Sequence, residues 1–319
     1  MKILILNNNS IDSNRSISID LICKNLTNVN SNLELEIDLV SNSSLVHESV
    51  FLKPTYFSEV RTRLAVNKLW KRKKNNYDLI VGVGITGLIK FYYWAISSKK
   101  KASISKTELK KYRNLGEIDF ETQVAEIILK KVNKEEQLFD LKPNVYLDEV
   151  KLKSTKKVIN WLLQSSDQKL LDKNSYIFIY LSSLEFISNS GIVLRLIDRV
   201  IRNRGGNKII LIVKKNNENK IKSEEYLNLF KGINDHILNL DFISYDDYYY
   251  ALTFSKESTL TITDDTHLNK INIIKDQYSI LIQKKTLNDV YIDNIIERLD
   301  YYLSVITRQE LLDPRERKR

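Results

Sequence analysis

The sequence predicts an α/β protein of two domains, and three features lead to this prediction. Apolar strand-like runs alternate with amphipathic helical segments, which is typical of a largely parallel sheet covered by helices. The length of 319 residues allows two domains of ordinary size. An apolar fraction of 43% supplies enough hydrophobic side chains for a core in each of them.

The first region, residues 1–135, is expected to form a Rossmann-like domain with a parallel sheet. Strands are predicted at KILIL, LELEIDLV and YDLIVGVG, because each is an apolar or alternating run of strand length. Helices are predicted at SISIDLICKNLTN, TYFSEVRTRLAVNKLWKRK, LIKFYYWAISS and FETQVAEIILKKV. The charged stretch NKEEQLFDLKPN contains one of only three prolines and predicts a domain boundary near residues 133–145.

The second region is expected to hold a smaller α/β domain over residues 145–255 and an extension over residues 256–319. Strands are predicted at NVYLDEVKL, SYIFIYL, NKIILIV and ILNLDFIS, and helices at STKKVINWLLQSSDQKLL, SEEYLNLFKGI, YDDYYYALTF and from Ile192 onward. In the extension, STLTIT and YSILIQ predict strands, and residues 287–312 predict a long helix. Its apolar side chains recur every four residues and should pack on the domain: Leu287, Tyr291, Ile295, Leu299 and Leu303.

The composition limits the classes of partner. A net charge of +10 is compatible with a polyanion, but the excess positive charge is spread out, with separate basic stretches such as KLWKRKKNN, SSKKKASISK, LKKYR and DPRERKR. No zinc finger, basic zipper or clear helix-turn-helix accompanies them, so nucleic acid is kept only as a third hypothesis without a motif. The single cysteine, Cys23, excludes an internal disulfide and fits a reducing cytosol.

Membrane and metal sites are not expected from the sequence. The first strand turns polar too early for a signal peptide, and no window of 18 residues is apolar and uncharged. We therefore expect a cytoplasmic protein with no membrane partner. His47, His236 and His267 lie far apart along the chain and have no ligand-like neighbours, so no metal site is predicted.

A glycine loop at residues 82–87 is the first candidate site. Gly82, Gly84 and Gly87 form a G-x-G-x-x-G pattern between a predicted strand and a predicted helix. Loops that bind phosphate need this arrangement, because glycines let backbone amides approach an anion at a helix N-terminus. The pattern predicts either a structural turn or a nucleotide or phosphoribosyl ligand held by Gly82, Gly84, Thr86 and Gly87.

The loop departs from the dinucleotide-binding fingerprint, since it does not follow the first strand and no acidic strand end comes about twenty residues later. It resembles the entry segment of type I phosphoribosyltransferases, whose paired acids have only Asp264 and Asp265 as a counterpart here. Together with the first strand, it is also similar to one half of a glycosyltransferase with two Rossmann-like halves, but the sequence shows no matching second half. These resemblances imply a phosphoribosyl- or nucleotide-sugar-dependent transferase.

The second candidate site is the stretch EFISNSGIVLRL. Ser188, Asn189 and Ser190 are suited to capping a helix that begins near Ile192, and Gly191 allows a tight turn. The helix that follows should turn Arg195 and Arg199 toward water.

With the glycine pair and strand that follow, this stretch resembles the centre of a STAS domain, the fold of anti-sigma-factor antagonists, over about residues 145–255. The resemblance implies a mixed sheet and a docking surface made of Ser188, Asn189, Ser190, Gly191, Arg195 and Arg199. It also implies a GHKL-type ATP-binding regulatory partner. Asn189 stands where the family has its phosphorylated serine, so the usual switch is missing. The favoured hypothesis is therefore a regulatory protein, and the transferase is the alternative.

Overall fold

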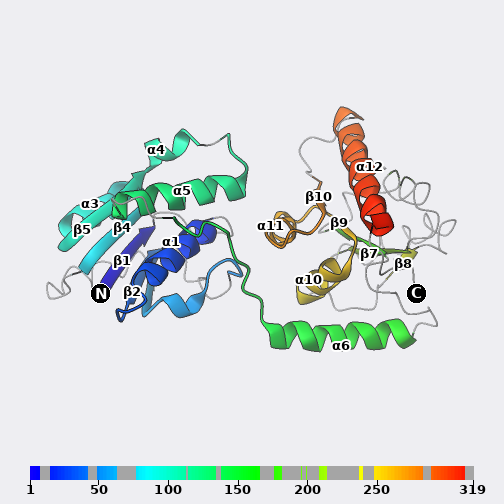
Figure 1. Cartoon of the computed structure of the whole chain (residues 1–319), viewed down its shortest axis with the longest axis horizontal. Helices are drawn as coiled ribbons and strands as arrows, with labels where there is room; N and C mark the ends of the chain where they lie inside the picture. Colours follow the sequence, from blue (N-terminus) through cyan, green and yellow to red (C-terminus); the bar gives the residue numbers. More distant parts are fainter. Residues whose placement is uncertain are drawn as a thin grey trace. The chain divides into compact units, whose positions relative to one another are not determined.

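A computed structural model of the chain describes residues 1–7, 15–41, 49–62, 77–112, 114–133, 138–165, 176–181, 195, 199, 208–213, 237–239, 248–282 and 289–312. The chain divides into two compact units, Met1–Leu147 and Asp148–Arg319. Each unit contains a five-stranded sheet, and all pairs of neighbouring strands in both sheets are parallel (Figure 1). The α/β fold class is therefore confirmed.

The sheet of the first unit has the strand order β3-β2-β1-β4-β5. Its strands are β1 (Lys2–Asn7), β2 (Glu36–Ser41), β3 (Glu59–Thr62), β4 (Tyr77–Ile85) and β5 (Ser98–Ser105). The chain builds β2 and β3 on one side of β1 and then crosses back to place β4 and β5 on the other side. This is the strand order of a Rossmann fold without its sixth strand, so the Rossmann-like domain predicted for this region is confirmed.

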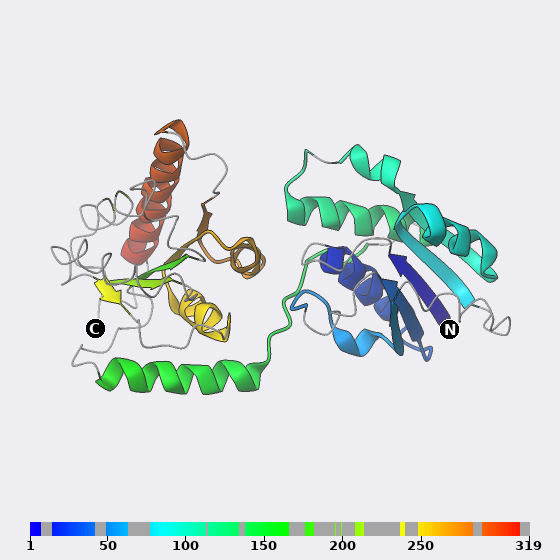
Figure 2. The ribbon, with the colours of Figure 1, turned by 180° about the vertical axis from the view of Figure 1, so that it is seen from behind.

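Helices cover both faces of this sheet. They are α1 (Arg15–Val29), α3 (Gly87–Ala95), α4 (Lys106–Lys110) and α5 (Glu117–Val132), with a short 3-10 turn, η2 (Pro54–Tyr56). Leu4 and Leu6 of β1 pack with α3, whereas the alternate residues Ile3 and Ile5 are buried on the opposite face. Helices α1 and α5 lie side by side (Figures 1 and 2). Because both faces are buried, β1 and β4 are continuous apolar runs.

The sheet of the second unit has the order β10-β9-β6-β7-β8. Its strands are β6 (Tyr176–Leu181), β7 (Lys208–Val213), β8 (Ile237–Asn239), β9 (Leu260–Thr263) and β10 (Ser279–Leu281). Read from β8, this is the same order as in the first unit, so the chain contains two Rossmann-type sheets. The predicted mixed sheet is wrong, because the described strands pair in parallel only.

Four described helices belong to the second unit: α6 (Glu149–Ser165), α10 (Tyr248–Glu257), α11 (Thr266–Ile274) and α12 (Asp289–Leu312). The predicted apolar stripe of α12 is confirmed at Ile295, Leu299 and Leu303, which are buried. A buried polar network joins α10, β9 and α11, because the Ser255 hydroxyl lies 2.9 Å from Thr261 Oγ1 and donates to Asn272 Oδ1 over 2.7 Å. No helix in the described part of the chain is both long and apolar enough to cross a membrane.

Two predicted elements are wrong. Residues 144–152 were expected to form a strand, but α6 begins at Glu149, where Asp148 Oδ1 accepts hydrogen bonds from the amides of Val150 and Lys151 over 2.9 and 3.1 Å. The segment before it, residues 138–147, lies along α1, where Asn25 and the backbone of Asp140 exchange two hydrogen bonds of 2.8 Å. The helix expected from residue 55 is also absent at its start, because β3 pairs with β2 there.

Candidate functional site

The first candidate site lies where β1 and β4 end side by side. In open parallel sheets, ligands bind beyond the carboxyl ends of the strands, at the point where the strand order reverses. In the first unit this point lies between β1 and β4, and Asn7, the last residue of β1, is paired with Val83. The Asn7 side chain is buried and donates from Nδ2 to the Ser41 hydroxyl at the end of β2, over 3.5 Å. A hydrogen bond thus joins the ends of β1 and β2 next to the glycine loop.

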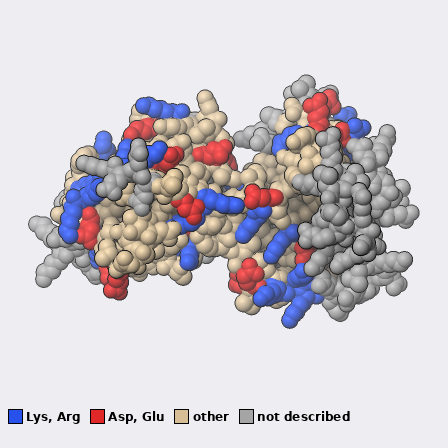
Figure 3. Space-filling view, in the orientation of Figure 1, with Lys and Arg blue, Asp and Glu red and all other residues tan. Residues whose placement is uncertain are grey.

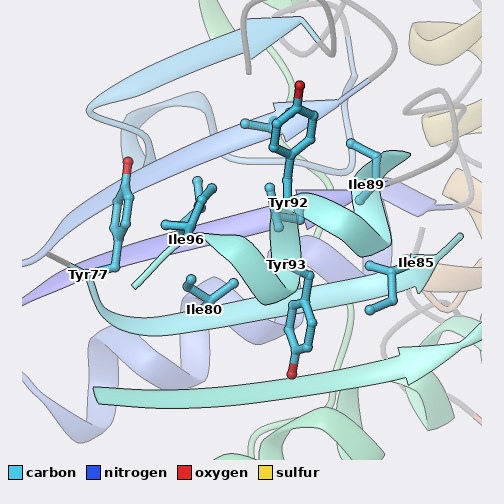
Figure 4. Packing of buried hydrophobic residues seen from close by; sticks show 10 residues of the cluster. Tyr77, Ile80, Ile85, Ile89, Tyr92, Tyr93 and Ile96 are labelled. Carbon is cyan, nitrogen blue, oxygen red and sulfur yellow. The ribbon is translucent and has the colours of Figure 1, made fainter. Parts of the chain in front are cut away.

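The glycines of the loop have different roles. Gly82 lies inside β4, and a side chain there would place Cβ 2.9 Å from Ile85 Cγ2 and 3.2 Å from Tyr93 Cδ2. Tyr93 and Ile85 belong to the cluster of buried residues between α3 and the sheet (Figure 4). Gly82 therefore has a packing role, because the lack of a side chain allows α3 to approach the strand closely. Gly84 and Gly87 have φ angles of 60° and 50°, a region that favours glycine.

Substituting Gly82 by alanine is expected to lower the free energy of unfolding by about 1–3 kcal/mol, because overpacking forces neighbouring side chains to shift. The matched control is Gly87→Ala, since a Cβ at Gly87 would have nothing within 4 Å. Only the strained φ angle would then cost about 1–2 kcal/mol. Urea unfolding of both variants measures the difference, and a Gly82→Ala variant as stable as the wild type would contradict the packing role.

Gly84 interrupts the pairing of β4 with β5. The register shifts between Val83 and Ile85, so Gly84 is an extra residue of the bulge type that often lies next to ligand sites. The chain then passes through Thr86, the N-cap of α3, whose side chain makes no capping hydrogen bond. The first turn of α3 also contains no acidic residue. Its backbone amides are therefore suited to an anion.

The polar groups at the end of β5, the strand next to β4, form hydrogen bonds with one another. Ser105 caps α4 and exchanges hydrogen bonds with Glu108 in a capping box. The Ser105 amide and the Lys131 ammonium lower the pKa of Glu108 to about 2. Of these two strand ends, only the one after β4 combines left-handed glycines with a helix whose N-cap side chain makes no capping hydrogen bond.

The second candidate site is the corresponding point of the other sheet, where β6 and β9 end side by side. Tyr180 of β6 is paired with Thr263, the last residue of β9. Asp265 follows as the N-cap of α11, and its Oδ1 accepts hydrogen bonds from the amides of His267 and Leu268 over 2.8 and 3.0 Å. The Thr263 hydroxyl accepts from the Asp265 amide over 3.0 Å. A side-chain carboxylate therefore already occupies the first turn of α11.

The electrostatics of this second point follow from burial and the two acids. Burial, together with the carboxylates of Asp265 and Asp264, raises the pKa of Tyr180 to about 12. Burial lowers the pKa of His267, the nearby Asp265 opposes this effect, and Lys270 adds to it. At neutral pH the Tyr180 phenol and the His267 imidazole are therefore uncharged, and with the polar side chains of Asp264 and Asp265 they suit the recognition of hydroxyl groups.

The sequence singled out Asp264 and Asp265, and His267 was considered only as a metal ligand, whereas nothing in the sequence pointed to Tyr180. The sites predicted around residues 188–191 fall outside the described residues. Arg195 and Arg199 are exposed, as predicted. Arg199 is bound within the chain, because its guanidinium donates to both carboxylate oxygens of Asp300 on α12, with distances of 2.7 to 3.2 Å. The described residues contain no cluster of three or more His, Cys, Asp or Glu side chains that could hold a metal.

No protein-family model matches the chain, and no curated protein matches it in sequence. Its fold is nevertheless similar to those of solved glycosyltransferases. The ADP-heptose lipopolysaccharide heptosyltransferase II of E. coli matches with a TM-score of 0.53 and 12% identity, over 96% of this chain and 99% of that one. A family 9 glycosyltransferase of Veillonella parvula matches with a TM-score of 0.54 and 10% identity, over 95% and 97% of the two chains. At such identities the likeness shows the fold alone.

These findings overturn the regulatory hypothesis. The STAS resemblance, and with it the regulator and its GHKL-type partner, is wrong, because the similar structures include heptosyltransferases and a family 9 glycosyltransferase and no STAS domain is among those found. The resemblance arose because a strand, a helix, a glycine pair and a second strand describe any βαβ unit. The strands that distinguish the two folds, β9 and β10, come after residue 255 and add to the sheet beside β6.

Proposed function

We propose that the protein is a glycosyltransferase that uses a nucleotide-activated sugar. The observation that carries this proposal is the repetition of one strand order in two parallel sheets, each with a loop at its point of reversal. The E. coli heptosyltransferases, one solved with ADP, have the same fold over 96% of this chain. A transferase needs to hold a donor and an acceptor, and two reversal points supply two places for ligands.

The diphosphate of the donor is assigned to the loop after β4. Gly84 and Gly87 shape this loop, Thr86 leaves the first turn of α3 without a side-chain cap, and a diphosphate would accept hydrogen bonds from its amides. The loop after β9 fits an anion less well, because the Asp265 carboxylate already accepts hydrogen bonds from the first turn of α11. Its neutral and acidic side chains fit the hydroxyl groups of a sugar.

In glycosyl transfer, a hydroxyl oxygen of the acceptor bonds to the anomeric carbon, and the bond to the nucleoside diphosphate breaks. A base must take the hydroxyl proton. The Asp264 carboxylate and the neutral imidazole of His267 are the candidates among the described residues at the second point. A cytoplasmic location is part of this proposal, since the single buried cysteine fits a reducing compartment.

Calorimetric titration of the full chain with ADP-, UDP- and GDP-sugars tests the proposal, with phosphoribosyl pyrophosphate as the rival ligand. We expect one sugar nucleotide to bind and Gly87→Asp to abolish binding, because the new carboxylate would repel the diphosphate. The control is Gly116→Asp, the same change at the N-cap of α5. Binding of phosphoribosyl pyrophosphate alone would contradict the proposal. If binding were lost in His267→Ala but kept in Gly87→Asp, the diphosphate would instead be assigned to the loop after β9 in the second sheet.

A further inference from the structure

Helix α3 has an exposed apolar face on the side away from the sheet. Leu88, Phe91 and Trp94 are 45%, 51% and 67% exposed, although they follow one another at helical spacing. The opposite side of the helix is buried through Ile89, Tyr92 and Tyr93 (Figure 4). A helix on the surface of a sheet normally turns charged residues outward. In α3 the only charged residue is Lys90.

The segment that carries this face has an excess of positive charge, although one of its lysines, Lys99, is paired with Asp78 over 2.7 Å. Residues 79–107 include five lysines and no aspartate or glutamate. By contrast, Figure 3 shows acidic and basic side chains interspersed over the face of the molecule in view.

Three of the five lysines follow one another on the edge strand β5, where side chains alternate between the two faces of the sheet. Lys100 donates to the Val132 carbonyl oxygen of α5, whereas Lys101 donates from Nζ to the carbonyl oxygens of Tyr93 and Trp94 over 2.8 and 3.0 Å. Positive charge is thus held next to Trp94.

We propose that the α3 face, formed by Leu88, Phe91 and Trp94, docks on an anionic membrane surface. Tryptophan and phenylalanine favour the boundary between lipid headgroups and acyl chains, and lysines are attracted to anionic lipids. Stable docking generally needs two such signals, and this face has both. A second copy of the chain would bring like charges together, whereas anionic lipid neutralises them. The expectation of no membrane partner depended on spanning segments and a signal peptide, and neither is needed for a protein that binds at the lipid surface.

This inference does not depend on the proposed function, although the α3 face lies next to the loop assigned to the diphosphate. Leu88 directly follows Gly87, so the apolar face begins at the glycine loop. A protein docked through α3 would therefore have the carboxyl ends of β1 and β4 close to the lipid surface. That position would suit a transferase whose acceptor is a membrane lipid, but vesicle binding tests the docking surface without reference to any sugar nucleotide.

The experiment is sedimentation of the full chain with vesicles of phosphatidylcholine alone or mixed with phosphatidylglycerol. The wild type is expected to bind the mixed vesicles and not the neutral ones. The variant Phe91→Ser/Trp94→Ser should bind at least about tenfold more weakly, because it loses two side chains that would be buried in lipid. Its matched control, Val150→Ser/Tyr301→Ser, removes two side chains that are 77% and 65% exposed elsewhere, and should bind like the wild type.

Charge is tested separately. Lys90→Gln should weaken binding by about fivefold, whereas Lys153→Gln, the same change on the exposed side of α6, should not. Circular dichroism checks that each variant is folded. Failure of the wild type to bind mixed vesicles, or equal binding by Phe91→Ser/Trp94→Ser, overturns the proposal. So does a dimer of the wild type in ultracentrifugation that this variant dissociates without any vesicle binding.

Discussion

Replacing Glu121 by alanine is expected to lower the free energy of unfolding by about 3–5 kcal/mol. Glu121 lies on α5, and its Oε2 is 3.2 Å from Nη1 of Arg15, the first residue of α1. Both side chains are buried, with exposed fractions of 4% and 8%. The Arg15 guanidinium also lies 5.8 Å from the centre of the Phe120 ring. The variant would leave a buried positive charge without its neutralising carboxylate, in surroundings that water does not reach.

Urea unfolding of the wild type and the variant measures this loss. The matched control is Glu126→Ala on the same helix, where the pair with Lys130 is 2.6 Å long but lies at the surface. A surface pair one helical turn apart contributes about 0.5 kcal/mol or less. The double variant Arg15→Met/Glu121→Leu should regain most of the stability, since apolar residues can replace a buried ion pair. A Glu121 variant no less stable than the control would contradict the prediction.

In the first sheet, the sequence predicted the central strands better than the edges, whereas both edge strands of the second sheet, β8 and β10, lie within predicted strands. The apolar runs of β1, β4 and β6 were recognisable because both faces of these strands are buried. Strand β5 was missed, because its lysines at positions 99–101 hide the apolar alternation, as charged residues on edge strands often do. Strand β3 was also missed, because it is four residues long and lies in a segment whose apolar spacing also fits a helix.

The two candidate sites also differ in how well the sequence predicted them. The glycine loop after β4 was found because its signal is local, with three glycines within six residues between a strand and a helix. The second point was not found, because it depends on the pairing of β6 with β9, about 80 residues later in the chain. Nothing local in the sequence places Tyr180 beside Asp264 and Asp265. This pairing joins β6 to β9 in the second Rossmann-type sheet, which is the matching half that was not recognised in the sequence.

Replacing Asp20 by asparagine is expected to stabilise the protein at neutral pH. Asp20 lies on α1 and is 1% exposed. Its carboxylate accepts hydrogen bonds from the Lys53 amide and the Tyr146 hydroxyl, each 3.1 Å long. Burial outweighs these interactions and raises the pKa of Asp20 from its ordinary value of 3.8 to about 6. An asparagine can keep the bond from the Lys53 amide without placing a charge in the interior.

The pH dependence follows from the direction of this change. The folded state binds the proton of Asp20 more tightly than the unfolded state, so the protonated carboxyl favours folding below about pH 4. That contribution is lost as the pH rises from about 4 to 6. The difference between 3.8 and about 6 corresponds to about 3 kcal/mol, the largest gain expected for Asp20→Asn at pH 7.5. At pH 4 the variant and the wild type should be nearly equal in stability.

Asp140 provides a control with the opposite sign. The Lys24 ammonium, 2.5 Å from its Oδ2, lowers the pKa of Asp140, so the charged form favours folding and its contribution is lost as the pH falls. Asp140→Asn should therefore destabilise the protein at pH 7.5, by less than about 1 kcal/mol because the pair is partly exposed. Urea unfolding at pH 4, 5, 6 and 7.5 compares the two variants with the wild type. An Asp20→Asn variant whose stability relative to the wild type does not change with pH would show that Asp20 titrates normally in the folded protein.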